Sequence, residues 1–182
     1  MNTAANSNDR TSDQSPFWRF SIRFYTVPGV APACIELQDR AGVDVNVLFF
    51  LLWNATQRRA LSEQDVAAVE RAIGPWRDGM VVPLRGVRRA LKTPPQAFSA
   101  EAAESLRNRV KSVELEAERL QQEALYRLAQ SSPLGRDAAS PIEAARASVA
   151  SYQSLLQPMP PAAIEAVLSA FAAFDAAPAD RA

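Results

Sequence analysis

The sequence contains no histidine and a single cysteine, Cys34, among 182 residues. The missing imidazole excludes Ser-His-Asp and Cys-His catalysis, histidine metal sites and imidazole acid–base chemistry near neutral pH. One cysteine excludes internal disulfides and thiolate zinc clusters. Cys34 lies on an apolar helical stripe without an evident basic neighbour, so we expect a small buried side chain rather than a reactive thiol. We assign no catalytic residue, no metal site and no cofactor.

The charges are balanced, with 20 Lys and Arg against 20 Asp and Glu. No overall field therefore draws the chain to nucleic acid or to an anionic membrane, and we expect no membrane partner. The N-terminal segment is polar and lacks the apolar stretch of a secretory signal, so the expected compartment is the cytoplasm. We expect residues 1–15 and 177–182 to be disordered tails.

The densest apolar run lies between Asp44 and Arg59, DVNVLFFLLWNATQRR. We predict a helix rather than a strand, because Asp44 is a good N-cap, Leu and Phe outnumber β-branched residues, and no turn signal interrupts the run. It is too short to cross a bilayer, which needs about 20 apolar residues. A helix that is apolar on all sides must be enclosed by other helices. We therefore expect it at the centre of a compact all-α domain over residues 16–93.

Local signals place further helices around this run. Ser15-Pro16 is typical of a helix start, a second helix is predicted over about residues 31–40 with Gly42 as its stop, and a capping box between Ser62 and Asp65 starts another.

The helix that starts at Ser62 is predicted to break at Gly74-Pro75. The segment from Trp76 to Leu91 again follows helical spacing, with a kink expected near its internal glycines and Pro83. Thr93-Pro94-Pro95 marks the clearest boundary in the chain.

Beyond this boundary the composition changes, because aromatic residues nearly vanish and charges of both signs alternate. A long amphipathic helix is predicted over residues 97–130. Its apolar residues follow the 4-3-4-3-4 spacing of a coiled coil: Leu106, Val110, Val113, Ala117, Leu120 and Ala124. Two further helices, near residues 141–156 and 162–174, complete a C-terminal unit over residues 97–176. We expect these two helices to pack on the seam as a hairpin or bundle, with self-association as the alternative. No segment predicts a strand.

A series of residues resembles the DUF2390 family of uncharacterised bacterial proteins. The series comprises Phe17-Trp18, Tyr25, Pro28-Gly29-Val30, Leu37-Gln38-Asp39-Arg40 with Gly42, Asp44-Val45-Asn46, Trp53, Trp76, and Pro83-Leu84-Arg85 to Leu91-Lys92. The resemblance covers about residues 16–92, extends through Val113-Glu114-Leu115, and does not include the chain after Gln130. It implies an all-helical cytoplasmic bacterial protein and no mechanism.

One candidate site is a polar turn formed by Gln38, Asp39, Asp44 and Asn46, which a short connection brings together. These groups at a helix N-terminus could hold a polar or anionic ligand, or one carboxylate could act as a base. The alternative, which we favour, is that Asp44 caps the helix and the amides tie the turn together.

A second candidate is a basic stripe on one helical face, bordered by Trp76: Arg77, Arg85, Arg88, Arg89 and Lys92. Spacings of three or four place most of these side chains together. They could contact RNA phosphates or an acidic protein. The alternative, which we favour, is a solvated face paired with the acidic stretch from Glu101 to Glu104.

Taken together, the patterns predict an all-α, non-enzymatic binding or adaptor protein. It would contact a protein or ribonucleoprotein partner through the basic stripe and the long helix, and RNA or a second copy of the chain are further candidate partners. The alternative is a protein or enzyme that binds a small polar ligand through Asp39, Asp44 and Asn46.

Overall fold

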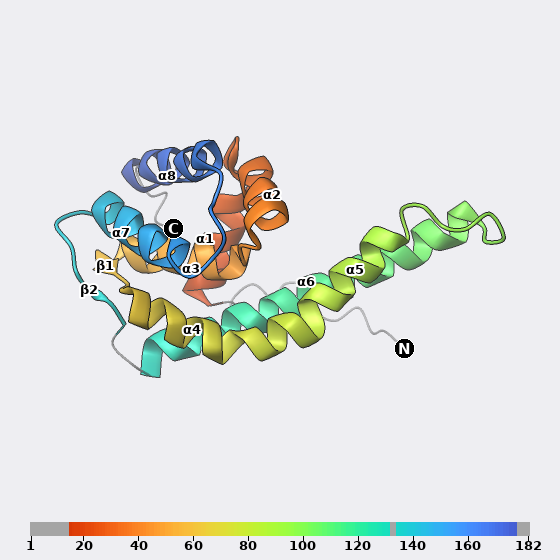
Figure 1. Ribbon diagram of the computed structural model, residues 1–182, viewed down its shortest axis with the longest axis horizontal. Coiled ribbons are helices and arrows are strands. Elements are labelled where there is room, and N and C mark those ends of the chain that lie inside the picture. Colours follow the sequence, from red (N-terminus) through yellow and green to blue (C-terminus); the bar gives the residue numbers. More distant parts are fainter. Residues whose placement is uncertain (1–14, 132–133, 178–182) are drawn as a thin grey trace, which may run out of the picture.

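The computed structural model describes residues 15–131 and 134–177 and confirms an all-α protein. In chain order the helices are α1 (Pro16–Tyr25), α2 (Val30–Ala41), α3 (Val45–Thr56), α4 (Glu63–Trp76), the π-helix η1 (Arg77–Val81), α5 (Val82–Ala90), α6 (Ala100–Ser131), α7 (Pro141–Gln153) and α8 (Pro161–Ala176). Figure 1 shows a rounded body from which a two-helix arm projects. The predicted disordered tails fall almost wholly outside the described residues. No helix within the described ranges is both long and apolar enough to cross a membrane.

Helix α3 is the centre of the body, as predicted. Every residue from Asn46 to Ala55 is buried, and α1, α6 and α7 pack around the helix. The rings of Phe17 and Phe50 meet edge to face with centroids 5.6 Å apart, and Phe24 meets Phe49 at 5.3 Å. Such pairs add to the free energy gained from apolar burial.

The predicted helix starts are confirmed by side-chain caps. Ser15 accepts a hydrogen bond from the Trp18 amide, Asp44 accepts from the Asn46 amide, and Ser62 and Asp65 form the complete capping box. Gly42 ends α2 with φ of 68°, a left-handed conformation that glycine adopts without steric cost.

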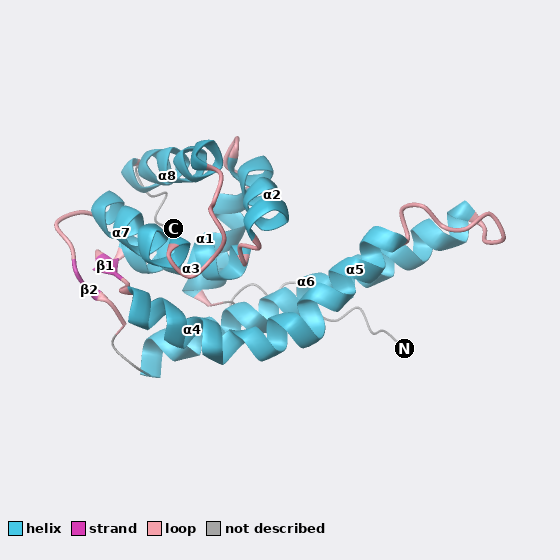
Figure 2. Cartoon of the chain, in the orientation of Figure 1, coloured by secondary structure: helices cyan, strands magenta, loops and turns pink. Residues whose placement is uncertain are grey.

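The expectation that no strand forms is wrong at one place. β1 (Arg59–Ala60) and β2 (Arg136–Asp137) pair antiparallel, as Figure 2 shows in magenta. Gly135 has φ of 72°, and a Cβ there would lie 2.7 Å from the Ala60 carbonyl oxygen. The Arg59 guanidinium bonds to the Asp137 carboxylate at 2.7 Å. Two-residue strands carry no periodic signal, so this long-range clip could not be read from the sequence.

The arm consists of α4, η1 and α5 packed antiparallel against α6 (Figure 1). The predicted break at Gly74-Pro75 is wrong, because α4 continues to Trp76 and passes into η1. There the Val82 amide donates to the Arg77 carbonyl, five residues back. A π-turn of this kind absorbs a local mismatch in the hydrogen-bond ladder while the helix continues, which suits a segment with prolines on both sides.

The C-terminal helices pack differently from our expectation for the long seam. Helix α7 lies on α3, and α8 lies on α2, so both complete the core of the body. Phe174 of α8 meets Phe24 of α1 edge to face. The seam of α6 instead faces α4, η1 and α5 along part of its width. Apolar packing explains the difference, since α3 offers α7 far more apolar surface than α6 does, and α8 packs on α2 and α7.

The central role of α3 predicts a large effect of truncating Phe50, which is 0% exposed. Phe50→Ala should lower the free energy of unfolding by about 3–5 kcal/mol, because it removes a fully packed ring and leaves a cavity. Phe98→Ala is the matched control: Phe98 is 67% exposed, and its loss should change stability by about 0.5 kcal/mol or less. Urea denaturation followed by circular dichroism measures both. Equal effects would contradict the enclosed position of α3.

Candidate binding groove

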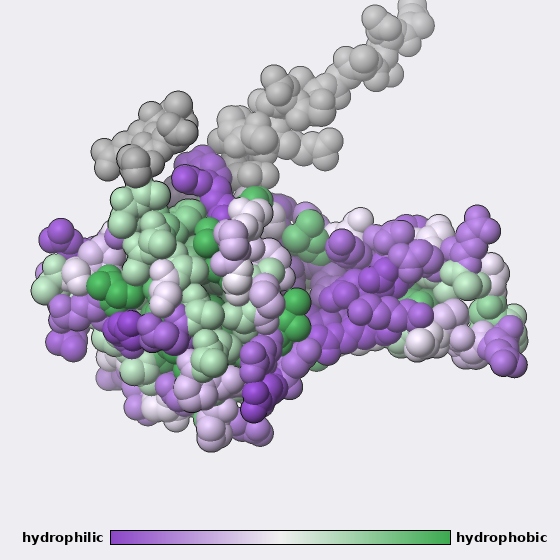
Figure 3. Space-filling model, turned by 90° about the horizontal axis from the view of Figure 1, so that it is seen from above, coloured by the Kyte–Doolittle hydropathy of each residue, from purple (hydrophilic) through white to green (hydrophobic). Residues whose placement is uncertain are grey.

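A groove of about 730 Å³ lies between the body and the arm. Helices α1 and α2 and the start of α3 form one wall, and α5 and α6 form the other. We call it the groove throughout. Figure 3, seen from above, shows hydrophilic side chains along the arm beside the body and apolar ones at the junction.

Both walls of the groove carry apolar side chains that are open to solvent. Ile22, Tyr25 and Ile35 project from the body wall, and Leu115 projects from α6. Their exposed fractions lie between 42% and 54%. Exposed apolar groups that gather in one concave surface are typical of a site that binds a ligand or another protein.

The basic stripe reaches the groove from α5, but its inner members are already paired. Arg85 contacts Glu118 at 2.8 Å and Glu114 at 3.2 Å, and Arg88 also bonds to Glu114. Burial alone would raise the pKa of the Glu114 carboxyl, but hydrogen bonds and charges from Arg88 and Arg85 outweigh it, so the pKa is lowered. The partners are thus on α6, and they are not the acidic stretch from Glu101 to Glu104 that we expected.

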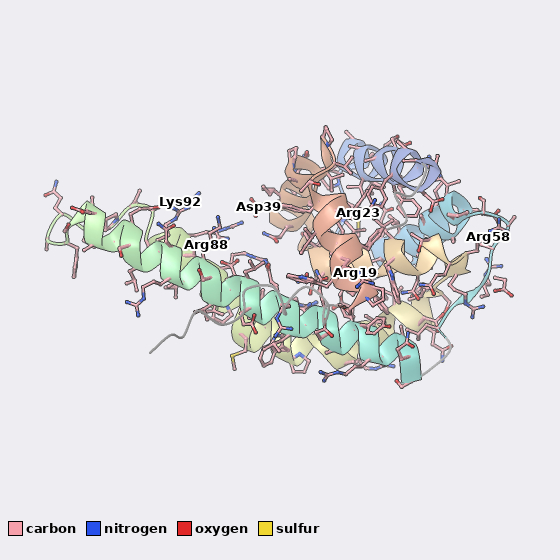
Figure 4. The ribbon with its side chains drawn as sticks, turned by 180° about the vertical axis from the view of Figure 1, so that it is seen from behind. Arg19, Arg23, Asp39, Arg58, Arg88 and Lys92 are labelled. Carbon is pink, nitrogen blue, oxygen red and sulfur yellow. The ribbon has the colours of Figure 1, made fainter. Side chains whose placement is uncertain are left out.

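Arg89 spans the groove from the arm to the body. Its guanidinium bonds to the Asp39 carboxylate of α2 at 2.7 Å, and this bond lowers the pKa of Asp39. Both residues also line a second hollow of about 410 Å³, next to the groove. Figure 4 shows Arg88 and Lys92 on the arm and Asp39 on the body side of the same gap.

Both lysines of the chain, Lys92 and Lys111, line the groove. Each is exposed, and neither makes an ion pair within the part of the chain that the structure describes. With Arg85, Arg88 and Arg89 they give the groove five cationic side chains against three carboxylates. The groove therefore carries an excess of positive charge although the whole chain is neutral.

The polar turn predicted from the sequence divides between the groove and the protein interior. Gln38, Asp39 and Asn46 line the groove, whereas Asp44 lines the second hollow beside Arg77. Asp44 is buried: one carboxylate oxygen caps α3, and the other accepts a 2.6 Å hydrogen bond from the Gln121 amide. Burial raises the pKa of this carboxyl. Both oxygens of Asp44 thus have structural partners, in agreement with the capping role that we favoured.

Asn46 forms a buried amide pair at the floor of the groove. Its side-chain oxygen accepts a 2.7 Å hydrogen bond from Gln122 of α6. The Gln122 oxygen is itself buried without a protein partner. Buried amide oxygens of this kind are commonly satisfied by water, so the floor is polar where the walls are apolar.

Two members of the predicted partner site lie outside the groove. Arg77 bonds to Glu70 and Asp78, and the hydrogen bonds and charges of these neighbours raise its pKa even though burial acts in the opposite direction. Trp76 donates from its indole nitrogen to the Ala117 carbonyl at 3.0 Å and so fixes the end of α4 on α6. Trp76 thus joins two helices of the arm, whereas the Arg77 guanidinium also lies 3.8 Å from the Asp44 carboxylate of the body.

Cys34 is buried behind the groove, as expected. Burial raises the pKa of its thiol to about 12, so the reactive thiolate form is scarce at neutral pH.

The lining residues that sequence reasoning missed include Tyr25, Ile35, Lys111 and Leu115. Each lies on the polar side of its helix or beside the main apolar stripe. The pattern of that helix alone therefore does not indicate that the residue belongs to a site. The signal that could have found Lys111 is its rarity, since the chain has only one other lysine.

Fold and site together define an all-α protein with a solvent-open, apolar and cationic groove between a helical body and a two-helix arm. The sequence profile described as "Protein of unknown function (DUF2390)" matches residues 16–125, and the chain belongs to this family. The matched range includes every residue that lines the groove. Comparisons with curated proteins and with solved structures find no match.

The paired carboxylates on α6 predict opposite effects of two similar substitutions. Because the folded-state pKa of Glu114 is lowered, its ionised form stabilises the fold at neutral pH, and this contribution is lost as the pH falls through that lowered value. Glu114→Gln should therefore cost about 1.5–3 kcal/mol at pH 7 and much less in acid.

Glu118 supplies the control, one turn along the same helix. Burial raises its pKa, so its ionisation does not stabilise the fold, and Glu118→Gln should leave stability at pH 7 unchanged or higher. Thermal unfolding between pH 3 and 7 measures both variants. A loss of stability for Glu114→Gln that does not diminish in acid would argue against the ion pair.

Proposed function

We propose that this is a non-enzymatic binding protein whose groove accepts an amphipathic, acidic helical segment of a partner protein. The observation that supports the proposal most directly is one concave surface that combines exposed apolar walls with two lysines, neither of which pairs with a carboxylate among residues 15–131 and 134–177. Helices with one apolar face bind in grooves of this composition through residues spaced three and four apart.

The charge of the groove determines the chemistry of the occupant. Glu114 and Glu118 neutralise Arg85, and Arg88 also bonds to Glu114, so these inner arginines hold the arm together rather than attract a ligand. Lys92 and Lys111 remain available at the rim. Acidic residues that flank an apolar stripe on the partner would meet these lysines, while the stripe itself covers Ile22, Ile35 and Leu115.

A small polar ligand held by Asp39, Asp44 and Asn46 is the alternative. It receives less support, because Asp44 is buried with both carboxylate oxygens bonded and Asp39 is paired with Arg89. Direct RNA binding receives less support as well, because most of the basic stripe is neutralised within the chain.

The proposal predicts that a synthetic amphipathic peptide of about 15 residues, with leucines on one face and glutamates beside them, binds the protein. Fluorescence anisotropy of the labelled peptide measures the affinity. Lys92→Glu combined with Lys111→Glu should weaken binding at least tenfold, because two attractive contacts become repulsive. The same peptide with lysines in place of glutamates should not bind.

The control variant combines Arg71→Glu with Arg136→Glu. Both arginines are exposed and lie away from the groove, so this variant has the same net charge as the lysine variant but should bind the peptide normally. Equal loss in the two variants would indicate a non-specific charge effect and would refute the groove as the site. Thermal stabilisation by citrate or pyrophosphate without peptide binding would favour the small-ligand alternative, and binding of oligouridine that weakens steeply with salt would favour RNA.

A further inference from the structure

A second surface of the arm carries apolar residues that no other described part of the chain covers. Leu106, Val113 and Leu120 recur every seven residues along α6 and are 45%, 55% and 43% exposed. On α5, Val87 is 50% exposed. We call these four residues the outer face.

The outer face and the groove lie on opposite sides of the arm. Lys111, Leu115 and Glu118 of α6 line the groove, and at 100° per residue Val113 lies about half a turn away from their mean direction. Val87 lies about 160° from both Arg85 and Arg89 on α5 in the same way. The heptad seam predicted from the sequence is thus only half occupied within the chain, because Ala117 is buried while its neighbours Val113 and Leu120 are open.

The charges beside the outer face match those of a second copy placed antiparallel. In such an arrangement Leu106 meets Ala124 and Leu120 meets Val110, while Val113 lies over the position of the partner's Ala117, which its own arm already buries. The two-fold axis is then level with residue 115. The same register sets Arg109 of each chain opposite Glu123 of the other. Neither residue makes an ion pair within the described parts of one chain. Glu116, nearest the axis, is paired with Arg119 of its own helix.

We infer that two copies of this protein associate through their outer faces, with the α6 helices antiparallel about a two-fold axis. The seam from Leu106 to Ala124 is about 27 Å long and the two packed helices of the arm are roughly 20 Å wide, so the face covers about 540 Å² per copy. This is smaller than the roughly 800 Å² per partner of a standard interface and corresponds to a dimer that dissociates on dilution. Each body then lies beside the tip of the partner's arm. The two grooves face away from the interface and stay open.

Light scattering after gel filtration tests the inference with a matched pair of variants on one helix. The wild-type protein should have twice the mass of one chain, and Val113→Glu should have the mass of one chain. Leu115→Glu is the control: Leu115 is 54% exposed, as Val113 is 55% exposed, but it faces the groove. It should stay dimeric and lose peptide binding, whereas Val113→Glu should keep peptide binding.

The charge register gives a second test. Arg109→Glu alone and Glu123→Arg alone should each weaken association about tenfold, because each places like charges opposite one another twice. An equimolar mixture of the two variants should restore it as a heterodimer. A wild-type mass of one chain at all concentrations would overturn the inference, and so would a dimer that Leu115→Glu dissociates and Val113→Glu does not. Circular dichroism shows whether each variant is folded.

Discussion

The structure depends on the need to enclose α3, a helix without a polar side. Ten consecutive buried positions, from Asn46 to Ala55, force neighbours to gather on every face, and helices from both ends of the chain meet there. Helix α7 supplies one neighbour, and it is held in register by the β1–β2 clip and by Tyr152, whose hydroxyl accepts a 3.0 Å hydrogen bond from the Asp44 amide. The body is therefore closed by residues more than a hundred positions apart.

The arm is held together mainly by ion pairs rather than by an apolar core. It has no comparable apolar core, and α5 has no buried residue at all. Its two helical segments are held together by the ion pairs of Glu114 with Arg85 and Arg88 and by the hydrogen bond from Trp76 to α6. Because Arg85, Arg88 and Arg89 are paired, the lysines are the distinctive cations of the groove. The distinctive apolar groups of the outer face are its exposed leucines and valines.

The contrast explains what could and could not be predicted. The enclosed helix, the caps at Ser15, Asp44 and Ser62, and the capping role of Asp44 follow from local chemistry, and all are present. The destination of α7 and α8, the strand pair and the partners of Arg85 and Arg88 depend on contacts between distant segments, which periodicity does not specify. The groove combines residues of both kinds. Asp39 and Asn46 come from the turn that the sequence predicts, whereas Lys111 and Leu115 come from α6, which meets this turn only in the folded chain.

The Arg89–Asp39 bond has a mechanical consequence. It ties the arm to α2 across the mouth of the groove, and its two side chains are 49% and 44% exposed. An ion pair so well hydrated contributes about 1 kcal/mol at most and is weakened by salt. The arm is therefore anchored firmly at its base and only weakly near its tip. A carboxylate of a bound partner would therefore compete with Asp39 for Arg89, and this competition would weaken the tie between the arm and α2.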